Sequence, residues 1–174
     1  MLGAHPEWQE RLRRQVLGIG QEALSWESLD DLSDVDLVLQ ECLRLFPPVM
    51  SVPRATLHET EIEGVRIPQH TILWLQAALI HRLERYWSDP ERFDPLRFSV
   101  ERAEHERHPG QYFPYSNGAH ICLGRRFSIL QVKSTLHALL GRFRIEIPAG
   151  YDPRRQLVPF PKPVDDIPVT FTPL

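Results

Sequence analysis

The pattern of apolar and polar residues along the chain predicts three helices. Residues 6–17 open with a proline, which suits the first turn of a helix, and then repeat apolar side chains every three or four positions. Residues 33–46 carry a second apolar stripe, with Ser33 as the expected N-cap and two prolines directly after the stripe. Residues 124–140 form the third helix, and apolar residues surround it, which predicts burial on most sides.

Short strands are predicted between the second and third helices. Residues 56–62 and 65–68 flank the pair Glu63-Gly64, a combination typical of a hairpin turn. Residues 71–75 predict another strand, and residues 76–82 a short helix. This part of the chain is therefore expected to form small β-sheets.

The remaining segments are irregular. Residues 87–115 show no convincing period, and a loop of that length in a compact domain is usually functional or disordered. Residues 142–174 predict short strands separated by prolines. A length of 174 residues suits one domain. The patterns together predict a fold that is mainly α with small β-sheets, in the α+β class.

The composition excludes several classes of function. The net charge of -3 and the absence of a Lys/Arg cluster predict no binding to nucleic acid. The longest apolar run, residues 71–80, is too short to be a membrane segment, and residues 1–9 do not have the pattern of a signal peptide. Two cysteines are too few for a disulfide framework and suit a reducing compartment, so a cytoplasmic location is expected.

Residues 112–124 contain the most informative motif. Gly118 and Gly124 bracket Cys122, which stands directly before the third predicted helix. The start of a helix offers positive potential and free N–H donors, so it favours a thiolate over a thiol. The glycines permit tight turns and the close approach of a flat ligand. The alternative, judged on the cysteine alone, is a buried structural residue, which is the commonest fate of a lone Cys.

This segment resembles the haem-thiolate signature of the cytochrome P-450 superfamily, in which an aromatic residue, a glycine, an arginine or histidine, the cysteine and a second glycine follow at fixed spacing. The matching residues are Tyr115, Gly118, His120, Cys122 and Gly124. Tyr115 departs from the usual Phe and adds a hydroxyl group that needs a partner. The resemblance implies haem b (iron protoporphyrin IX), with Cys122 as the axial iron ligand and His120 at a haem propionate.

A second resemblance lies in three charged residues. Glu41 and Arg44 match the Glu-x-x-Arg of the family's K helix, although an exposed pair at this spacing is common and weak. Residues 89–98 match the family's Asp-Pro-x-x-Phe-x-Pro-x-Arg-Phe, which makes Arg97 the third member. Arg92 belongs to a literal Pro-Glu-Arg-Phe, but out of register. The implied triad is structural: it is expected to be buried, to fix the loop under the cysteine, and to take no part in chemistry.

The resemblance also implies a role for Arg54 and indicates which part of the family's fold this chain covers. Arg54 is implied to pair with a haem propionate, because a guanidinium fork suits a carboxylate; the alternative is a solvated strand arginine. Residues 1–174 resemble the family from its J helix through its L helix and terminal strands, so they are expected to be its C-terminal haem-binding part. The upstream half, with the I helix, is absent. The chain is then a fragment, half of a split enzyme with a missing N-terminal half as partner, or an inactive relic.

The resemblance implies a haem-thiolate monooxygenase, which inserts one oxygen atom from O₂ into a small organic substrate and takes electrons from a redox partner protein. The alternative is a haem-binding module or inactive remnant without turnover. A third alternative, from another class, is a zinc site of Cys122 and His120 with His105 or His108, although this spacing fits no usual zinc pattern.

Overall fold

The computed structural model describes residues 1–20, 24–157 and 160–174. In these ranges the α-helices are α1 (Pro6–Ile19), α2 (Ser33–Leu45), α3 (Ala77–Ile80) and α4 (Arg125–Leu140). Short 3-10 turns add η1 (Leu2–Ala4), η2 (Glu27–Leu29), η3 (Pro95–Phe98), η4 (Glu104–Glu106) and η5 (Gly118–His120). Within the described ranges, no helix is long and apolar enough to cross a bilayer.

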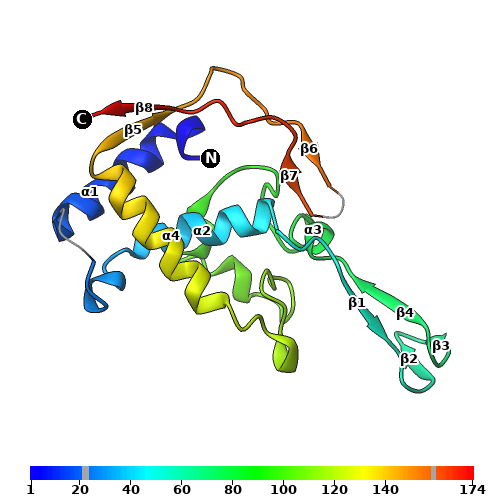
Figure 1. Ribbon diagram of the computed structural model, residues 1–174. Helices are drawn as coiled ribbons and strands as arrows, with labels where there is room; N and C mark the ends of the chain where they lie inside the picture. The colour runs from blue at the N-terminus through cyan, green and yellow to red at the C-terminus, as the bar shows by residue number, and fades with distance from the viewer. Residues whose placement is uncertain (21–23, 158–159) are drawn as a thin grey trace.

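The described strands pair two by two into antiparallel ribbons. The pairs are β1 (Val52–Ala55) with β4 (Ile72–Leu75), β2 (Thr60–Ile62) with β3 (Val65–Ile67), β5 (Phe143–Glu146) with β8 (Thr170–Pro173), and β6 (Arg155–Gln156) with β7 (Lys162–Pro163). The β1–β4 and β2–β3 ribbons extend away from the helices as an arm, as Figure 1 shows. The predicted α+β fold with small sheets is confirmed.

The core lies where α1, α2 and α4 meet, and α4 packs across the other two helices (Figure 1). The helices α1 and α2 contribute residues of their predicted apolar stripes, and α4 contributes Leu140. The buried members of the core are Leu12, Val16, Leu32, Val35, Val38, Leu45, Phe93 and Leu140. Because a fully buried side chain of this size stabilises a fold by about 1.5–3 kcal/mol, this cluster is the main apolar contribution of the described chain.

Buried polar side chains of α1 fix the end of α4 and the start of β5. Arg13 donates hydrogen bonds to the carbonyl oxygens of Leu140 and Phe143 at 3.0 and 2.9 Å. A helix leaves its last carbonyl groups without partners, so a buried cation at this end compensates both the carbonyls and the helix dipole. Gln9 exchanges hydrogen bonds with the backbone of Ile145, both at 2.8 Å.

The prediction of Ser33 as the N-cap of α2 is wrong. The helix begins at Ser33 itself, and the preceding residue, Leu32, has no side chain that can cap it. Gln15 of α1 does the capping instead: its amide oxygen accepts the Asp34 N–H at 3.1 Å, and its amide nitrogen donates to Ser33 Oγ at 3.1 Å. A cap from a neighbouring helix depends on tertiary packing, so the local sequence pattern could not reveal it.

The predicted hairpin is confirmed at its turn. Glu63 and Gly64 both have positive φ, 48° and 81°, as a two-residue type I′ turn requires. The first strand is shorter than predicted because Thr56 closes the base of the arm instead of pairing in β2. Its hydroxyl donates to the Pro68 carbonyl at 2.7 Å and accepts the Thr71 N–H at 2.9 Å. The strand β1, which pairs with β4, was not predicted.

The expected burial of the third helix on most sides is wrong for this chain. The buried residues of α4 are Lys133, His137 and Leu140, all in its second half. Its first half is open: the side chain of Phe127 is 69% exposed. The reason is geometric, because α1, α2 and β5 contact only one side of α4 within the described chain.

We expect the change Gln15→Ala to lower the free energy of unfolding by about 1 kcal/mol, because the first N–H groups of α2 lose their acceptor. Urea denaturation measures the difference. The matched control is Arg14→Ala, an exposed neighbour on the same helix, which should stay within about 0.5 kcal/mol of the parent. Equal stabilities for the two variants would contradict the capping role.

Candidate functional site

The backbone of the cysteine loop, residues 115–124, is held by its own hydrogen bonds. The Cys122 N–H donates to the Tyr115 carbonyl at 2.8 Å, and the Cys122 carbonyl accepts the Arg125 N–H at 3.2 Å. Asn117 Oδ1 accepts the Gly118 N–H at 2.8 Å and so starts the turn η5. These bonds fix the backbone at Cys122, which lies three residues before the first residue of α4.

The two cysteines have opposite environments. Cys122 is free and exposed. Cys42 lies within α2, where burial, with a smaller contribution from the charge of Glu41, raises its pKa to about 11. A thiol with that pKa stays protonated at neutral pH and does not act as a ligand. The alternative of a buried structural cysteine therefore describes Cys42 and not Cys122.

Apolar side chains close to Cys122 in the sequence are exposed. Ile121, Leu123 and Phe127 are 49%, 100% and 69% exposed, and such a group of neighbouring apolar side chains marks a binding surface. Gly118 has a φ of +61°, and nothing lies within 4 Å of the position that a Cβ would take. Gly124 has an ordinary backbone conformation, and a Cβ there would stand 3.8 Å from the Cys122 sulfur. Gly124 therefore leaves space beside the sulfur, where a side chain would touch it.

The hydroxyl group of Tyr115 has the partner that it needed. Its oxygen lies 2.9 Å from Ser128 Oγ on the first turns of α4. The Arg125 guanidinium lies over the Tyr115 ring, 5.9 Å from its centroid. Ser128 was missed by the sequence analysis. The available signal was its position at the start of the third predicted helix, six residues after Cys122. From there its hydroxyl group reaches Tyr115 in the loop.

Two other residues expected at the cofactor are placed separately. His120 is exposed at the end of η5. Arg54 lies on β1, half-buried, and its guanidinium donates to the carbonyl of Pro53 at 2.9 Å. Between described residues, no hydrogen bond or ion pair joins Arg54 or His120 to the cysteine, so the structure does not bring them together directly.

The zinc alternative has no ligand set in the structure. Among the described residues, no three His, Cys, Asp or Glu side chains gather as they would around a metal ion. His105 instead packs against Phe98, with ring centroids 5.1 Å apart. His108 packs against Tyr86 at the same distance. Both histidines therefore belong to the aromatic packing of the long loop.

Glu41, Arg44 and Arg97 lie together with no exposed side-chain surface. Arg44 binds both oxygens of Glu41, with Nε–Oε2 at 2.7 Å and Nη2–Oε1 at 2.9 Å. Arg97 Nε donates to Glu41 Oε1 at 3.2 Å, and the Asp94 N–H donates to the same oxygen at 2.8 Å. The carboxylate is thereby fully hydrogen-bonded, as a buried charge must be.

The two guanidinium groups also hold the irregular loop. They donate to five backbone carbonyl oxygens at 2.6–3.3 Å. These carbonyls belong to His81, Ser88, Asp89, Pro90 and Arg92. The side chain of Arg92 is exposed, and only its backbone takes part. A loop without regular structure is thus fixed to α2 by charge-assisted hydrogen bonds.

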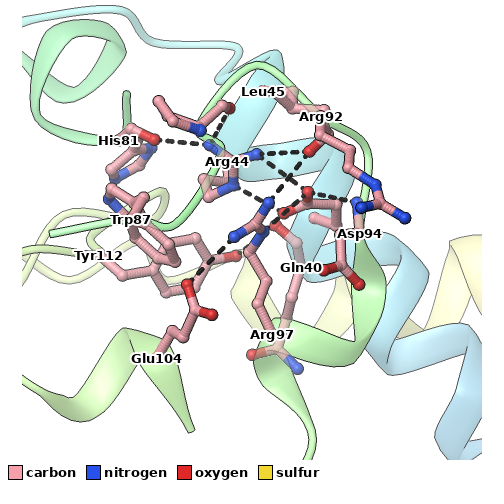
Figure 2. Close-up of polar contacts among 12 residues, drawn as sticks. Gln40, Arg44, Leu45, His81, Trp87, Arg92, Asp94, Arg97, Glu104 and Tyr112 are labelled. Atoms are coloured by element: carbon pink, nitrogen blue, oxygen red, sulfur yellow. Dashed lines mark hydrogen bonds and ion pairs between the residues drawn. The ribbon is translucent and has the colours of Figure 1, made fainter. Parts of the chain in front are cut away.

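A fourth charged residue, missed by the sequence analysis, completes the network. Glu104 is buried, and its Oε2 accepts from Arg97 Nη1 at 3.0 Å (Figure 2). Burial alone would raise the pKa of Glu104, but hydrogen bonds from Arg102 and the Ser88 N–H, with the charge of Arg97, hold it below its ordinary value. Glu104 stands among other charged residues in the sequence, and such a run usually forms a solvated face.

His81 joins the network to the segment before the cysteine loop. It is fully buried, and its Nε2 accepts the Phe113 N–H at 3.1 Å. Its ring packs against Tyr112 and Phe113, with centroids 5.2 and 5.3 Å away. Burial and the charge of Arg44 lower the pKa of His81 to about 4, so the ring is neutral in the folded protein at neutral pH.

A cavity of about 390 Å³ lies between α2 and the segment that leads to the cysteine loop. Its lining residues are Asp36, Leu39, Gln40, Leu43, Tyr112, Phe113, Pro114, Tyr115, Ser116, Asn117, Ile121, Arg125 and Ile129. Cys122 is not part of this lining. The cavity therefore borders the cysteine loop without including the exposed Cys122.

Comparison with known proteins identifies the relatives of this chain. The family model described as Cytochrome P450 matches residues 1–166. A protein of Mycobacterium tuberculosis described as putative cytochrome P450 136 is 40% identical over 173 residues, 99% of this chain. Cytochrome P450 734A6 of Oryza sativa subsp. japonica is 34% identical over 177 residues, also 99% of this chain. Thromboxane-A synthase of Mus musculus is 38% identical over 149 residues, 84% of this chain.

The chain spans about a third of the length of these curated relatives. The matched region covers 35% of the mycobacterial protein, 33% of the rice protein and 28% of the mouse synthase. Both sequence motifs lie within residues 1–166, which the family model matches.

We expect Glu41→Gln to lower the free energy of unfolding by about 3–5 kcal/mol, because two buried guanidinium groups would lose the carboxylate between them. Urea denaturation measures the change. Arg92→Gln is the matched control, since it alters an exposed arginine of the same loop and should cost no more than about 0.5 kcal/mol. A similar loss in both variants would show that the literal motif, and not the network, carries the stability.

The stability of the folded chain should fall by about 3 kcal/mol through His81 as the pH drops from 6.5 to about 4. The pKa of His81 is lower in the folded than in the unfolded state, so its contribution is complete above pH 6.5 and is lost through the folded pKa. Urea denaturation at several pH values should give a flatter profile for His81→Gln than for the parent. His120→Gln, at an exposed histidine, should leave the profile parallel to that of the parent, and parallel profiles for both variants would refute the assignment.

Proposed function

Because the chain belongs to the cytochrome P450 family, we propose that it is the C-terminal haem-binding part of a haem-thiolate monooxygenase, with Cys122 as the axial ligand of the iron. The observation that supports this most is the exposed, free sulfur of Cys122 in a loop closed by hydrogen bonds directly before α4. The exposure of this thiol leaves the sulfur open to a ligand that approaches the loop.

The residues around the sulfur have separate parts in this proposal. Gly118 and Gly124 leave room for the flat ring, and Leu123 and Phe127 offer apolar contact to it. The hydrogen bond between Tyr115 and Ser128 fixes the aromatic ring of the loop against α4. This bond and the backbone bond from the Cys122 N–H to the Tyr115 carbonyl hold the loop in place before a ligand binds.

Cations would hold the acidic edge of the cofactor. His120 is exposed within the cysteine loop, and Arg54 pairs with no carboxylate in the described chain, so both are available for the haem propionates. The triad of Glu41, Arg44 and Arg97 makes no contact of this kind. All its donors and acceptors are used internally, so it acts by holding the loop.

Haem b, when bound, would supply the oxygen chemistry by which a monooxygenase inserts one atom of O₂ into a small organic substrate. A redox partner protein would provide the electrons. We also propose that an upstream part of the protein covers the open face of α4, since an exposed apolar surface normally marks an interface. A cytoplasmic location completes the proposal and is supported by the two free thiols.

Haem binding without turnover is the second candidate. The residues that we assign to the cofactor all lie in this chain, whereas the chain spans about a third of the length of its curated relatives. The sulfur and the propionate contacts would therefore be available whether or not the residues that activate oxygen are present.

The test is to express the chain with haem, reduce it and add carbon monoxide. A strongly red-shifted Soret band is expected for the parent, because a thiolate opposite carbon monoxide changes the electronic transitions of the iron complex. Cys122→Ala should abolish this band, and Cys42→Ala, the matched control, should keep it. A band that survives Cys122→Ala, or a spectrum without any bound haem in the parent, would refute the proposed function.

A further inference from the structure

Glu104 is a second buried carboxylate in the arginine network. Its side chain has 2% of its surface exposed, beside 0% for Arg97. Oε2 accepts from Arg97 Nη1 at 3.0 Å and from the Ser88 N–H at 3.3 Å, and Oε1 accepts from Arg102 Nη2 at 2.6 Å. Both carboxylate oxygens therefore have donors, and one of these donors is a fully buried guanidinium group.

The charges of the network show why this second carboxylate is needed. Arg44 and Arg97 bring two positive charges into a space without water contact, and Glu41 offers one negative charge to both. A buried charge without compensation is strongly destabilising. Glu104 contacts Arg97 through Nη1 (Figure 2). Glu41 contacts a different nitrogen of the same guanidinium group, Nε. Arg102, the further partner of Glu104, is partly exposed, so water screens its charge.

Glu104 also reaches the segment that leads to the cysteine. Its backbone carbonyl accepts from the buried Gln111 side chain at 2.5 Å. Beyond Gln111 the chain runs directly into the segment whose N–H groups at Phe113 and Cys122 donate to partners at 3.1 and 2.8 Å. The side chain of Glu104 thus anchors to the network, and its backbone anchors the start of the segment.

We propose that Glu104 is a positioning residue for the cysteine loop: its carboxylate neutralises Arg97, and the turn that it anchors sets where the segment from Gln111 to Cys122 lies. The consequence at Cys122 rests on the proposed function, but the positioning role does not. It is a property of the folded chain without cofactor. Glu104 acts through Arg97 and Gln111 and does not contact the sulfur.

The test is hydrogen exchange of the full 174-residue chain. Glu104→Gln keeps the shape of the side chain and removes its charge. The expected result is a loss of protection of about tenfold or more at the Phe113 and Cys122 N–H groups, because an uncompensated Arg97 opens the local structure. The N–H groups within α1 should keep their protection. Glu106→Gln is the matched control, since Glu106 lies in the same turn with an exposed side chain and should leave all protection unchanged.

A conservative variant separates charge from packing. Glu104→Asp keeps the charge and should fold with protection at Phe113 and Cys122 close to that of the parent. If Glu104→Gln does not fold, the proposal is still tested by whether Glu104→Asp folds with parental protection. The proposal is overturned if Glu104→Gln keeps parental protection at both positions, if it loses protection equally in α1, or if Glu104→Asp is as damaged as Glu104→Gln.

Hydrogen exchange tests the positioning role, and the spectrum with carbon monoxide tests the haem-thiolate function. Either claim can fail without the other. A loss of protection confined to the Gln111–Cys122 segment supports the positioning role even where no red-shifted band forms in the parent, and in that case only the haem-thiolate function is lost. A normal band in Glu104→Gln with unchanged exchange would overturn the positioning role and leave the haem function intact.

Discussion

The structure depends on the cost of burying charge. Arg44 and Arg97 are fully enclosed, and a guanidinium group away from water needs an acceptor for nearly every N–H. Glu41 and Glu104 supply the negative charge, and backbone carbonyls supply the remaining acceptors. The long loop has almost no regular secondary structure to satisfy its own carbonyls. The carbonyl groups of the loop need hydrogen-bond donors, and the arginines need acceptors. The two sets of groups bind each other.

The cysteine loop follows a different principle. Its backbone is closed by hydrogen bonds, whereas the side chain of Cys122 is left exposed among apolar neighbours. Tyr112 and Phe113 tie the preceding segment to α2 and to the ring of His81. A rigid frame with one open side chain is the arrangement that a ligand site needs, because the frame does not have to be ordered when the ligand binds.

How much the sequence could predict depended on the range of the interaction. The three long helices and the Glu63-Gly64 turn were predictable because period and turn chemistry are local. The placement of Arg97 beside Glu41 came from a motif, and no helix period would have indicated it. Gln15 and Glu104 were missed because a cap from a neighbouring helix and a buried carboxylate in a charged run are both decided by tertiary contacts.

The same limit explains the error on α4. An apolar pattern around a helix predicts that the helix is covered, but it does not indicate which segment covers it. In the described chain, α1, α2 and β5 cover one side, and Phe127 stays exposed. The contact between Arg97 and Glu41 has its own consequence for how the chain folds. It joins residues 56 positions apart, so a large loop must close before this contact can form. Each charge also has a nearer partner, Arg44 for Glu41 and Glu104 for Arg97, so this contact links two local ion pairs into one network.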